Sequence, residues 1–321
     1  MKTTCPVTFA LLVALVAVPT RAQDTWPAQS VRFVVPSSPG GATDTYARLL
    51  AQGLGETLKR QFIVDNRPGA SGNVGAEIAA RAAPDGYTFL VASSASLVID
   101  PSLYKNLPYS AERDFTPVAR GVISPLAIAA HPSVPANTLP ALIALAKREP
   151  GKLTYGSAGA GSPPNLAVKM LEEAAGVRFL HVPYKGSAPV LVGLLQGEIE
   201  FMGSSVSTVQ PLAQAKKVVP LAASHRTPHL PGTPTFAEAG YPSVDSVPTF
   251  SVVAPMGNSP VVIQRLSAEI VKLMKTPAFR EKLDARALIP VFDTPDEFAV
   301  VLKKERARYA EVIRRNNIVA E

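Results

Sequence analysis

Short runs of apolar, often β-branched residues alternate with stretches of helical spacing along most of the chain of 321 residues. Several runs are apolar throughout, which is typical of strands that are buried on both faces of a sheet. The stretches between them keep apolar residues three or four positions apart, as Leu50, Leu54 and Leu58 do, and predict amphipathic helices. The runs that predict strands are 31–35, 62–64, 87–92, 153–157, 179–182 and 218–223.

This alternation predicts an α/β fold with parallel strands and right-handed crossovers, and it occurs twice along the chain. Segments 118–125 and 240–247 are candidate crossings between two lobes. The pattern therefore predicts a Venus-flytrap fold, in which two doubly wound lobes enclose a ligand cleft and two crossings act as hinges. In this division residues 23–122 and 243–321 form lobe 1, and residues 123–242 form lobe 2.

The last helix has the clearest start signal. The sequence from Thr294 to Glu297 predicts a capping box with proline at the first helical position. Phe298, Leu302 and Tyr309 then follow on one apolar stripe, while the basic residues between 303 and 315 fall largely on the other face. That basic face is interpreted as a solvated surface, with a docking surface as the alternative.

The amino terminus predicts export. Lys2 precedes an apolar run at 7–18, and Thr20-Arg21-Ala22 forms a small-x-small site, so residues 1–22 are interpreted as a signal peptide cleaved near Ala22. The run is shorter than the ~20 residues that a membrane-spanning helix needs. The mature protein is therefore expected in the periplasm. The only cysteine, Cys5, leaves with this segment.

Composition adds a mild preference for anionic ligands. The formal net charge is +7, but the basic residues are spread along the chain and partly matched by acids, which disfavours nucleic-acid binding. The four histidines lack metal-ligand spacing, and His181 at a strand end is interpreted as structural. No G-x-S-x-G or phosphate-binding loop motif is present. We therefore expect a monomer that is not an enzyme and has no metal, cofactor or nucleic-acid partner.

The first candidate binding element is a glycine turn at 36–44, PSSPGGATD, between the first strand and a helix. Gly40 and Gly41 permit close backbone approach, and Thr43 or Asp44 is expected to cap the helix. Free N–H groups at the positive end of a helix dipole bind a carboxylate or phosphate without a basic side chain. The alternative is a plain strand-to-helix turn.

The second half of the chain repeats this arrangement at 155–167, YGSAGAGSPPNLA. Its glycines are Gly156, Gly159 and Gly161, and a helix follows Ser162. Two such turns, one in each lobe, predict a site that holds one carboxylate from opposite sides of the cleft.

Six segments in consistent order resemble the substrate-binding receptors of tripartite tricarboxylate transporters, also called Bug-type receptors. They are PSSPGGATD, DNRPGASGNVGA, APDGYTFL, YGSAGAGS, HVPYKGSAP and LPGTPTFAEAGYP. The resemblance spans nearly the whole mature chain. It implies a periplasmic receptor that captures a small organic carboxylate for integral membrane transporter subunits, with the carboxylate held by both glycine turns. The implied ligand-binding residues are Ser37, Gly40, Gly41, Ala42, Thr43, Asp44, Ser93, Ser94, Ser157, Ala158, Gly159, Gly161, Ser162, Asn165, Tyr184, Lys185, Ser204 and Ser205.

Two departures from the family pattern bear on the ligand. Asn165 stands where the family often has histidine, and Ser204 stands near a position where it usually has aspartate. The loss of that acid disfavours an ammonium group, so a mono- or dicarboxylate is expected rather than an amino acid. Tyr184 and Lys185 have a structural-loop interpretation as the alternative to ligand contact.

Two other functions remain open at this stage. A receptor of the same design can pass its liganded state to a membrane signalling protein instead of a transporter. An exported hydrolase or isomerase would need a titratable acid–base pair in the cleft, where the sequence offers mainly backbone donors and hydroxyls.

Overall fold

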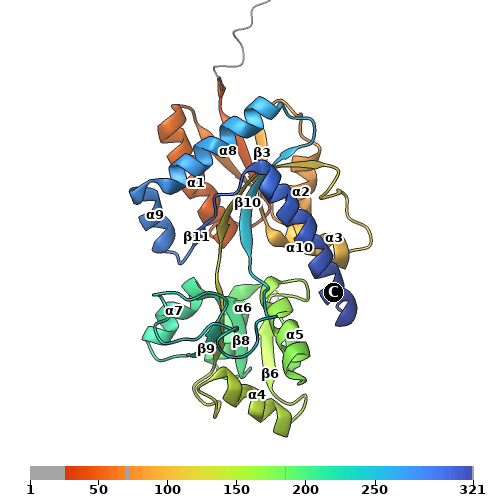
Figure 1. Cartoon of the computed structure of the whole chain (residues 1–321), viewed down its shortest axis with the longest axis vertical. Helices are drawn as coiled ribbons and strands as arrows, with labels where there is room; N and C mark the ends of the chain where they lie inside the picture. Colours follow the sequence, from red (N-terminus) through yellow and green to blue (C-terminus); the bar gives the residue numbers. More distant parts are fainter. Residues whose placement is uncertain (1–25, 70–71, 185, 320–321) are drawn as a thin grey trace, which may run out of the picture.

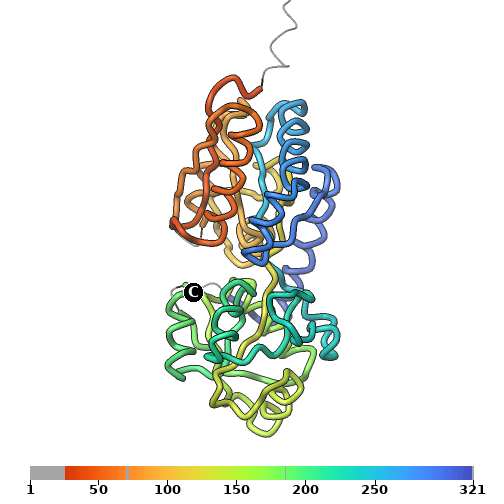
Figure 2. Tube along the Cα trace, turned by 90° about the vertical axis from the view of Figure 1, so that its left-hand side faces the viewer, coloured from red at the N-terminus to blue at the C-terminus, as the bar shows by residue number. Residues whose placement is uncertain are grey.

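The computed structural model describes residues 26–69, 72–184 and 186–319. The predicted signal peptide, residues 1–22, lies outside this part of the chain. Figure 1 shows two lobes, one above the other, and the view in Figure 2 shows the narrow connection between them. Within the described residues, no helix combines the length and apolar character needed to cross a bilayer.

Lobe 1 is built on a six-stranded sheet with the order β11-β4-β10-β3-β1-β2. Strands β1, β2 and β3 are parallel, whereas β10 runs antiparallel to both β3 and β4. Its strands are β1 (Val31–Val35), β2 (Phe62–Asn66), β3 (Thr88–Ser93), β4 (Phe115–Ile123), β10 (Thr249–Pro255) and β11 (Ile289–Pro290). Its helices are α1 (Ala42–Leu58), α2 (Asn73–Ala80), η2 (Ala95–Ile99), α3 (Asp100–Leu103), α8 (Pro260–Lys275), α9 (Pro277–Asp284) and α10 (Pro295–Arg315).

Lobe 2 is built on a five-stranded sheet with the order β7-β6-β8-β5-β9. Strand β6 is parallel to β7 and β8, and β5 is antiparallel to β8 and β9. Its strands are β5 (Leu126–Ala130), β6 (Thr154–Ser157), β7 (Leu180–Pro183), β8 (Phe201–Ser205) and β9 (Val219–Ala223). Its helices are α4 (Leu139–Arg148), α5 (Pro163–Ala175), α6 (Ser187–Leu195) and α7 (Val206–Gln214).

The two α/β lobes confirm the predicted fold class, but the expectation of wholly parallel sheets is wrong. Both sheets are mixed, because the strand that follows each crossing, β5 in lobe 2 and β10 in lobe 1, runs antiparallel to both of its neighbours. Strand β4 ends at Ile123 in one sheet and β5 begins at Leu126 in the other. The return segment lies beside this crossing, where the Ser124 N–H donates to the Pro248 carbonyl at 2.8 Å. The division of the chain at residues 122 and 242 stays a prediction.

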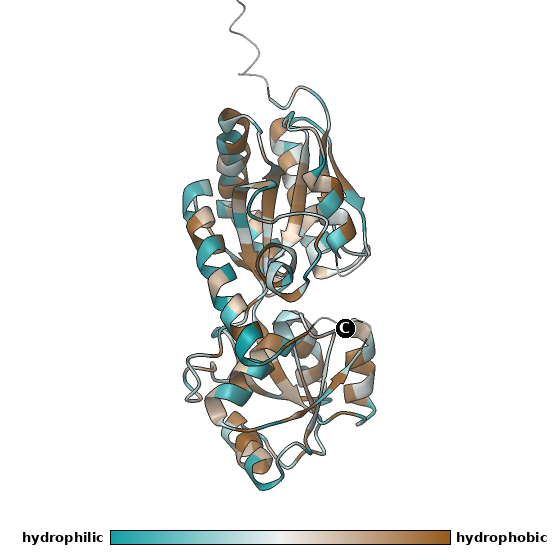
Figure 3. Ribbon diagram, turned by 90° about the vertical axis from the view of Figure 1, so that its right-hand side faces the viewer, coloured by the Kyte–Doolittle hydropathy of each residue, from teal (hydrophilic) through white to brown (hydrophobic). Residues whose placement is uncertain are grey.

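Apolar strands fill the interior of each lobe, and the polar faces of the helices point outward (Figure 3). In lobe 1, Leu50 and Leu54 of the predicted helix stripe are fully buried against the sheet, and Leu58 at the end of α1 is partly buried. In lobe 2 the ring of Tyr155 stacks on Phe201, with centroids 5.5 Å apart. The predicted capping box of α10 is present, because the Thr294 hydroxyl accepts from the Glu297 N–H and the Glu297 carboxylate accepts from the Thr294 N–H.

Candidate functional site

A cavity of about 380 Å³ lies where the two lobes meet. It is placed at the carboxyl ends of strands from both sheets, which is where open α/β folds bind ligands. Lobe 1 contributes the start of α1, the end of β3 and Phe250, while lobe 2 contributes the starts of α5, α6 and α7. The lining residues are Gly41, Ala42, Ser93, Ser124, Leu126, Ala158, Ser162, Pro163, Pro164, Ser187, Val190, Met202, Gly203, Ser204, Ser205, Thr208, Pro248 and Phe250.

The first glycine turn presents the start of α1 to this cavity. Gly41 is the N-cap residue, and no side chain caps the helix. The expectation that Thr43 or Asp44 caps α1 is wrong, because the helix begins at Ala42 and both residues already lie in its first turn. The N–H groups of the first helical turn have no acceptor within the helix. The N–H of Ala42, which lines the cavity, is therefore a donor that this wall offers to an anion.

The buried carboxylate of Asp44 stabilises the first turn by hydrogen bonds. Its side chain is 2% exposed, and its carboxylate accepts from the Gly40 N–H at 2.9 Å, from Arg48 Nε at 2.9 Å and from Asn66 Nδ2 at 2.8 Å. Burial raises the pKa of Asp44, but the hydrogen bonds from Arg48, Gly40 and Asn66 outweigh burial, so the net pKa is lowered. Asp44 is thus an ionised anchor for the turn, and its carboxylate is already engaged.

The second glycine turn is built differently. Ser162 is the N-cap of α5, and Pro163 and Pro164 occupy the first two helical positions. Proline has no N–H, so this helix start lacks two of the donors that α1 provides. The remaining polar groups that this turn offers to the cavity come from its loop, at Ala158 and Ser162.

The polar side chains of the second turn mainly hold the turn itself. The Ser157 hydroxyl lies 2.6 Å from His181 Nε2 and accepts from the Gly159 N–H at 3.2 Å. Asn165 is 1% exposed; its Oδ1 accepts from the Tyr155 hydroxyl at 2.7 Å, and its Nδ2 donates to the Ala160 carbonyl at 2.6 Å. His181 therefore has the structural partner that its position predicted.

A group of hydroxyls lines the lobe 2 side of the cavity where β8 meets α7. Ser205 is the N-cap of α7, and its hydroxyl accepts from the Thr208 N–H at 3.3 Å and lies 2.8 Å from the Thr208 hydroxyl. Ser204 lies on the same wall. Thr208 was not predicted, although its position three residues after the N-cap residue Ser205 could have indicated it.

The cavity brings together seven of the predicted site residues: Gly41, Ala42, Ser93, Ala158, Ser162, Ser204 and Ser205. Ten others do not line it: Ser37, Gly40, Thr43, Asp44, Ser94, Ser157, Gly159, Gly161, Asn165 and Tyr184. Several of these have other partners. The Ser94 hydroxyl accepts from the Thr249 N–H, and the Tyr184 hydroxyl donates to Glu198 at 3.5 Å. Lys185 lies outside the described residues. Direct ligand contact by these side chains stays a prediction.

Sequence reasoning also missed the apolar part of the wall. Leu126, Val190, Met202, Pro248 and Phe250 line the cavity together with Ser124 and Ser187. None of the described lining residues carries a charged side chain. Among the residues that the structure describes, no cluster of His, Cys, Asp and Glu could hold a metal ion. The described wall can therefore bind an anion through N–H and O–H donors but presents no acid–base pair.

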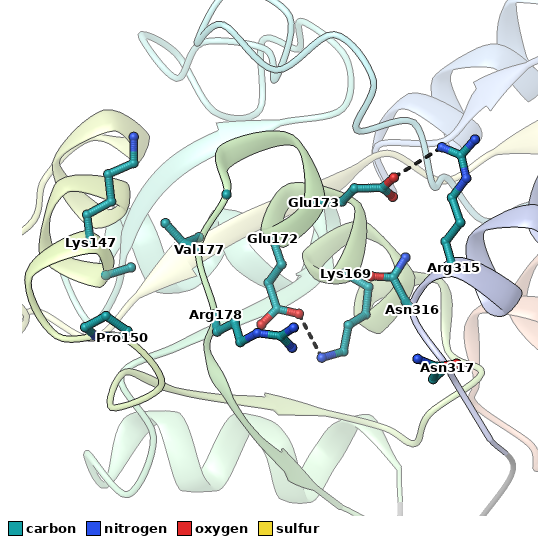
Figure 4. Close-up of a pocket in the computed structure, with 12 residues that line it drawn as sticks. Lys147, Pro150, Lys169, Glu172, Glu173, Val177, Arg178, Arg315, Asn316 and Asn317 are labelled. Carbon is teal, nitrogen blue, oxygen red and sulfur yellow. Dashed lines mark hydrogen bonds and ion pairs between the residues drawn. The ribbon is translucent and has the colours of Figure 1, made fainter.

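A larger cavity of about 790 Å³ lies on the flank of the molecule, between α4, α5 and the end of α10 (Figure 4). Four of its charged side chains form ion pairs with one another. Lys169 Nζ is 2.8 Å from Glu172, and Arg315 is 3.2 Å from Glu173. Glu172 also accepts from the Phe179 N–H. None of the described residues that line this cavity belongs to a strand or to either of the two predicted glycine turns, so the smaller cavity between the lobes is the better candidate site.

Comparison with known proteins identifies the family of this chain. Residues 46–318 match the model of the tripartite tricarboxylate transporter family receptor, TctC. The chain belongs to the TctC family. TctC receptors are solute-binding proteins and not enzymes, and their solved relatives include periplasmic binding proteins.

Individual relatives support this assignment over almost the full chain. BugT of Bordetella pertussis is 35% identical over 309 residues, which cover 95% of this chain and 94% of BugT. The structure of Rpa4515 of R. palustris with adipate has a TM-score of 0.83 and 32% identity, covering 92% of this chain and 99% of that protein. MatC of Rhodopseudomonas palustris with bound malate has a TM-score of 0.78 and 27% identity, covering 90% and 100%.

Proposed function

We propose that this TctC receptor captures a small mono- or dicarboxylate between its lobes in the periplasm and delivers it to the membrane subunits of a tripartite tricarboxylate transporter. The observation that carries this proposal is the uncapped start of α1 at Gly41 and Ala42, which forms one wall of a cavity shared by both lobes. An uncapped helix start supplies directed N–H donors and a positive dipole end to an anion.

Hydrogen bonding of this kind is strong enough for a transport receptor. Each hydrogen bond to a charged group contributes about 1.5–3 kcal/mol. Three or four bonds to one carboxylate therefore account for most of the ~8 kcal/mol of micromolar binding. The donors are the α1 start on one side and the hydroxyls of Ser204 and Ser205 on the other, because the Ser162 hydroxyl already donates to the Gly159 carbonyl at 2.8 Å.

The remaining wall favours a ligand with a short uncharged body. Val190, Met202 and Phe250 supply apolar surface, while Ser204 offers a hydroxyl where an acid would select an ammonium group. The cavity size suits a small metabolite. Relatives with adipate and with malate bound are consistent with a carboxylate of this size.

The test is a ligand search on the mature receptor. Native mass spectrometry of the purified protein detects a retained ligand, and a thermal-shift panel compares monocarboxylates, dicarboxylates and amino acids. Because a ligand that binds only the folded state raises the unfolding temperature by mass action, a mono- or dicarboxylate should stabilise the receptor. Stabilisation by amino acids alone, or chemical conversion of the bound compound during incubation, would contradict the proposal.

A further inference from the structure

A buried chain of polar groups connects α10 to the start of α5. The hydroxyls of Tyr309 and Ser246 lie 3.3 Å apart, and the Ser246 hydroxyl donates to the Pro163 carbonyl at 2.9 Å. Tyr309 is fully buried and Ser246 is 1% exposed. We propose that Ser246 and Tyr309 are positioning residues for the ligand cleft, because they fix the Pro163 carbonyl and with it the start of α5. The proposal rests on the function proposed above for the cleft.

Pro163 is the residue that links these buried hydrogen bonds to the ligand cleft. It is the first residue of α5 and lines the cavity between the lobes, whereas neither Ser246 nor Tyr309 lines it. The helix start has few anchors of its own, since no side chain caps it and Pro163 and Pro164 have no N–H. The hydroxyl of Ser246 therefore supplies an anchor from outside the helix.

The number of hydrogens on each group fixes the direction of these hydrogen bonds. The Ser246 hydroxyl has one hydrogen, which goes to Pro163, so its oxygen accepts from the Tyr309 hydroxyl. The carbonyl of Pro163 has two lone pairs and accepts from Ser246 as well as within the helical pattern of α5. Removal of the Ser246 hydroxyl takes this second bond from the Pro163 carbonyl.

The other end of the chain is anchored in lobe 1. Helix α10 has 21 residues, so it is about 31 Å long, and its first half packs against lobe 1 through the buried side chains of Phe298 and Leu302. Its second half contacts the return crossing, where the Arg308 guanidinium donates to the Asp245 carbonyl and lies 3.1 Å from the Asp245 carboxylate.

The end of α10 also reaches lobe 2 directly. Figure 4 shows the ion pair between Arg315 of α10 and Glu173 of α5, 3.2 Å apart. This pair is largely exposed and contributes little energy by itself. It shows, however, that α10 lies along α5 beyond the Ser246 contact, so a single rigid helix of lobe 1 holds the ligand-facing start of α5.

Hydrogen–deuterium exchange tests the positioning role without any ligand. In Ser246→Ala, the amides of residues 165–168 should exchange at least about 5-fold faster than in the wild type, while lobe 1 peptides exchange unchanged. Tyr309→Phe keeps the ring and the Ser246–Pro163 bond, so about a 2-fold increase is expected. The matched control is Tyr109→Phe, which removes a buried hydroxyl that donates to the Ser96 carbonyl at 2.9 Å, away from α5.

Ligand affinity supplies the second measurement, with the carboxylate that gives the largest thermal shift as the probe. Ser246→Ala should weaken its binding about 10-fold, and Tyr109→Phe should lower the unfolding temperature with affinity unchanged. Unchanged exchange at 165–168 in Ser246→Ala would overturn the positioning role, as would equal loss of affinity in both variants. If no carboxylate binds the wild type, the proposed function fails, and the exchange result still decides the positioning role. If Ser246→Ala does not fold, amide exchange at 165–168 and ligand affinity are measured in Tyr309→Phe instead, and they test the positioning role by the same criteria.

Discussion

The two glycine turns look alike in sequence but present different chemistry to the cleft. The first ends in Gly41, with free N–H groups on the following residues and an ionised Asp44 behind it. The second ends in Ser162 followed by two prolines, and its Ser157 and Asn165 side chains bond within the lobe. The first turn offers N–H donors to the cavity, while the second shapes the opposite wall.

This difference teaches that a glycine-rich turn before a helix predicts close approach, not hydrogen-bonding capacity. The capacity depends on which residues fill the first helical positions. Ala42 and Thr43 keep their N–H groups, whereas Pro163 and Pro164 have none. A carboxylate should therefore bind with its charge toward lobe 1 and its body toward lobe 2.

The largest expected effect follows from blocking the first turn. A Cβ on residue 41 would lie 3.3 Å from the Ser38 carbonyl oxygen, and Gly41 lines the cavity. Gly41→Val should therefore displace the turn and weaken carboxylate binding at least about 100-fold, or ~2.8 kcal/mol, as measured by calorimetry.

Gly55→Val is the matched control for this change. Residue 55 lies in the same helix, and a Cβ there would be 3.2 Å from the Arg60 carbonyl oxygen, but it is far from the cavity. This variant should lose some stability and keep its affinity. Equal affinities for Gly41→Val and the wild type would remove the first turn from the site.

A smaller effect should follow from making the second turn resemble the first. Pro164→Ala adds an N–H at the second position of α5, on the wall of the cavity. Because an added donor strengthens anion binding while lost proline stiffness opposes it, we expect carboxylate binding about 3-fold tighter. Pro260→Ala makes the same change at the start of α8, outside the cavity, and should leave affinity unaltered. Weaker binding by Pro164→Ala would mean that the carboxylate does not approach α5.

The smallest expected effect is a difference in acid sensitivity. Burial of the ring, followed by the nearby Lys169 ammonium, lowers the pKa of His181, the β7 residue that contacts Ser157 of the second turn. Stability from neutral His181 is therefore present above its unfolded pKa of about 6.5 and is lost as pH falls through the lowered folded pKa. The net pKa of Asp44 is also lowered, so its contribution is present above about pH 3.9 and is lost only as pH falls through its folded pKa.

Denaturant unfolding at pH 7, 6 and 5 measures this contrast. The wild type should lose more unfolding free energy over this range than His181→Gln. Asp44→Asn should follow the wild-type pH dependence in the same range and differ from it only in stronger acid. Parallel curves for the wild type and His181→Gln would contradict a contribution of His181 titration to the stability of the receptor.

Much of the fold could be predicted because the signals are local. The strand at 31–35, the buried stripe of α1 and the capping box at Thr294 depend on neighbours in sequence, and all three are present. The mixed direction of the sheets could not be predicted in this way. It depends on where β10 and β5 enter their sheets, and those pairings join residues far apart in the chain.

The candidate site was predictable at its turns and not in its wall. Gly41 and Ser162 could be identified from the sequence because each lies between a predicted strand and a predicted helix. Phe250 and Leu126 line the cavity because the crossings bring β10 and β5 beside it. A local sequence pattern cannot predict this tertiary arrangement. The prolines at 163 and 164 were visible in the sequence, and the missing donors follow from their chemistry alone.

The central place of β10 has a consequence for how the molecule is assembled. The described strands of the lobe 2 sheet come from residues between 126 and 223, whereas β10, between β3 and β4 in lobe 1, comes from residues 249–255. Lobe 1 must therefore wait for a late segment to join strands made much earlier, and such long-range pairing is slow. The lobe that carries the Gly41 turn is therefore completed last, and a chain that ends before β10 lacks one wall of the cavity between the lobes.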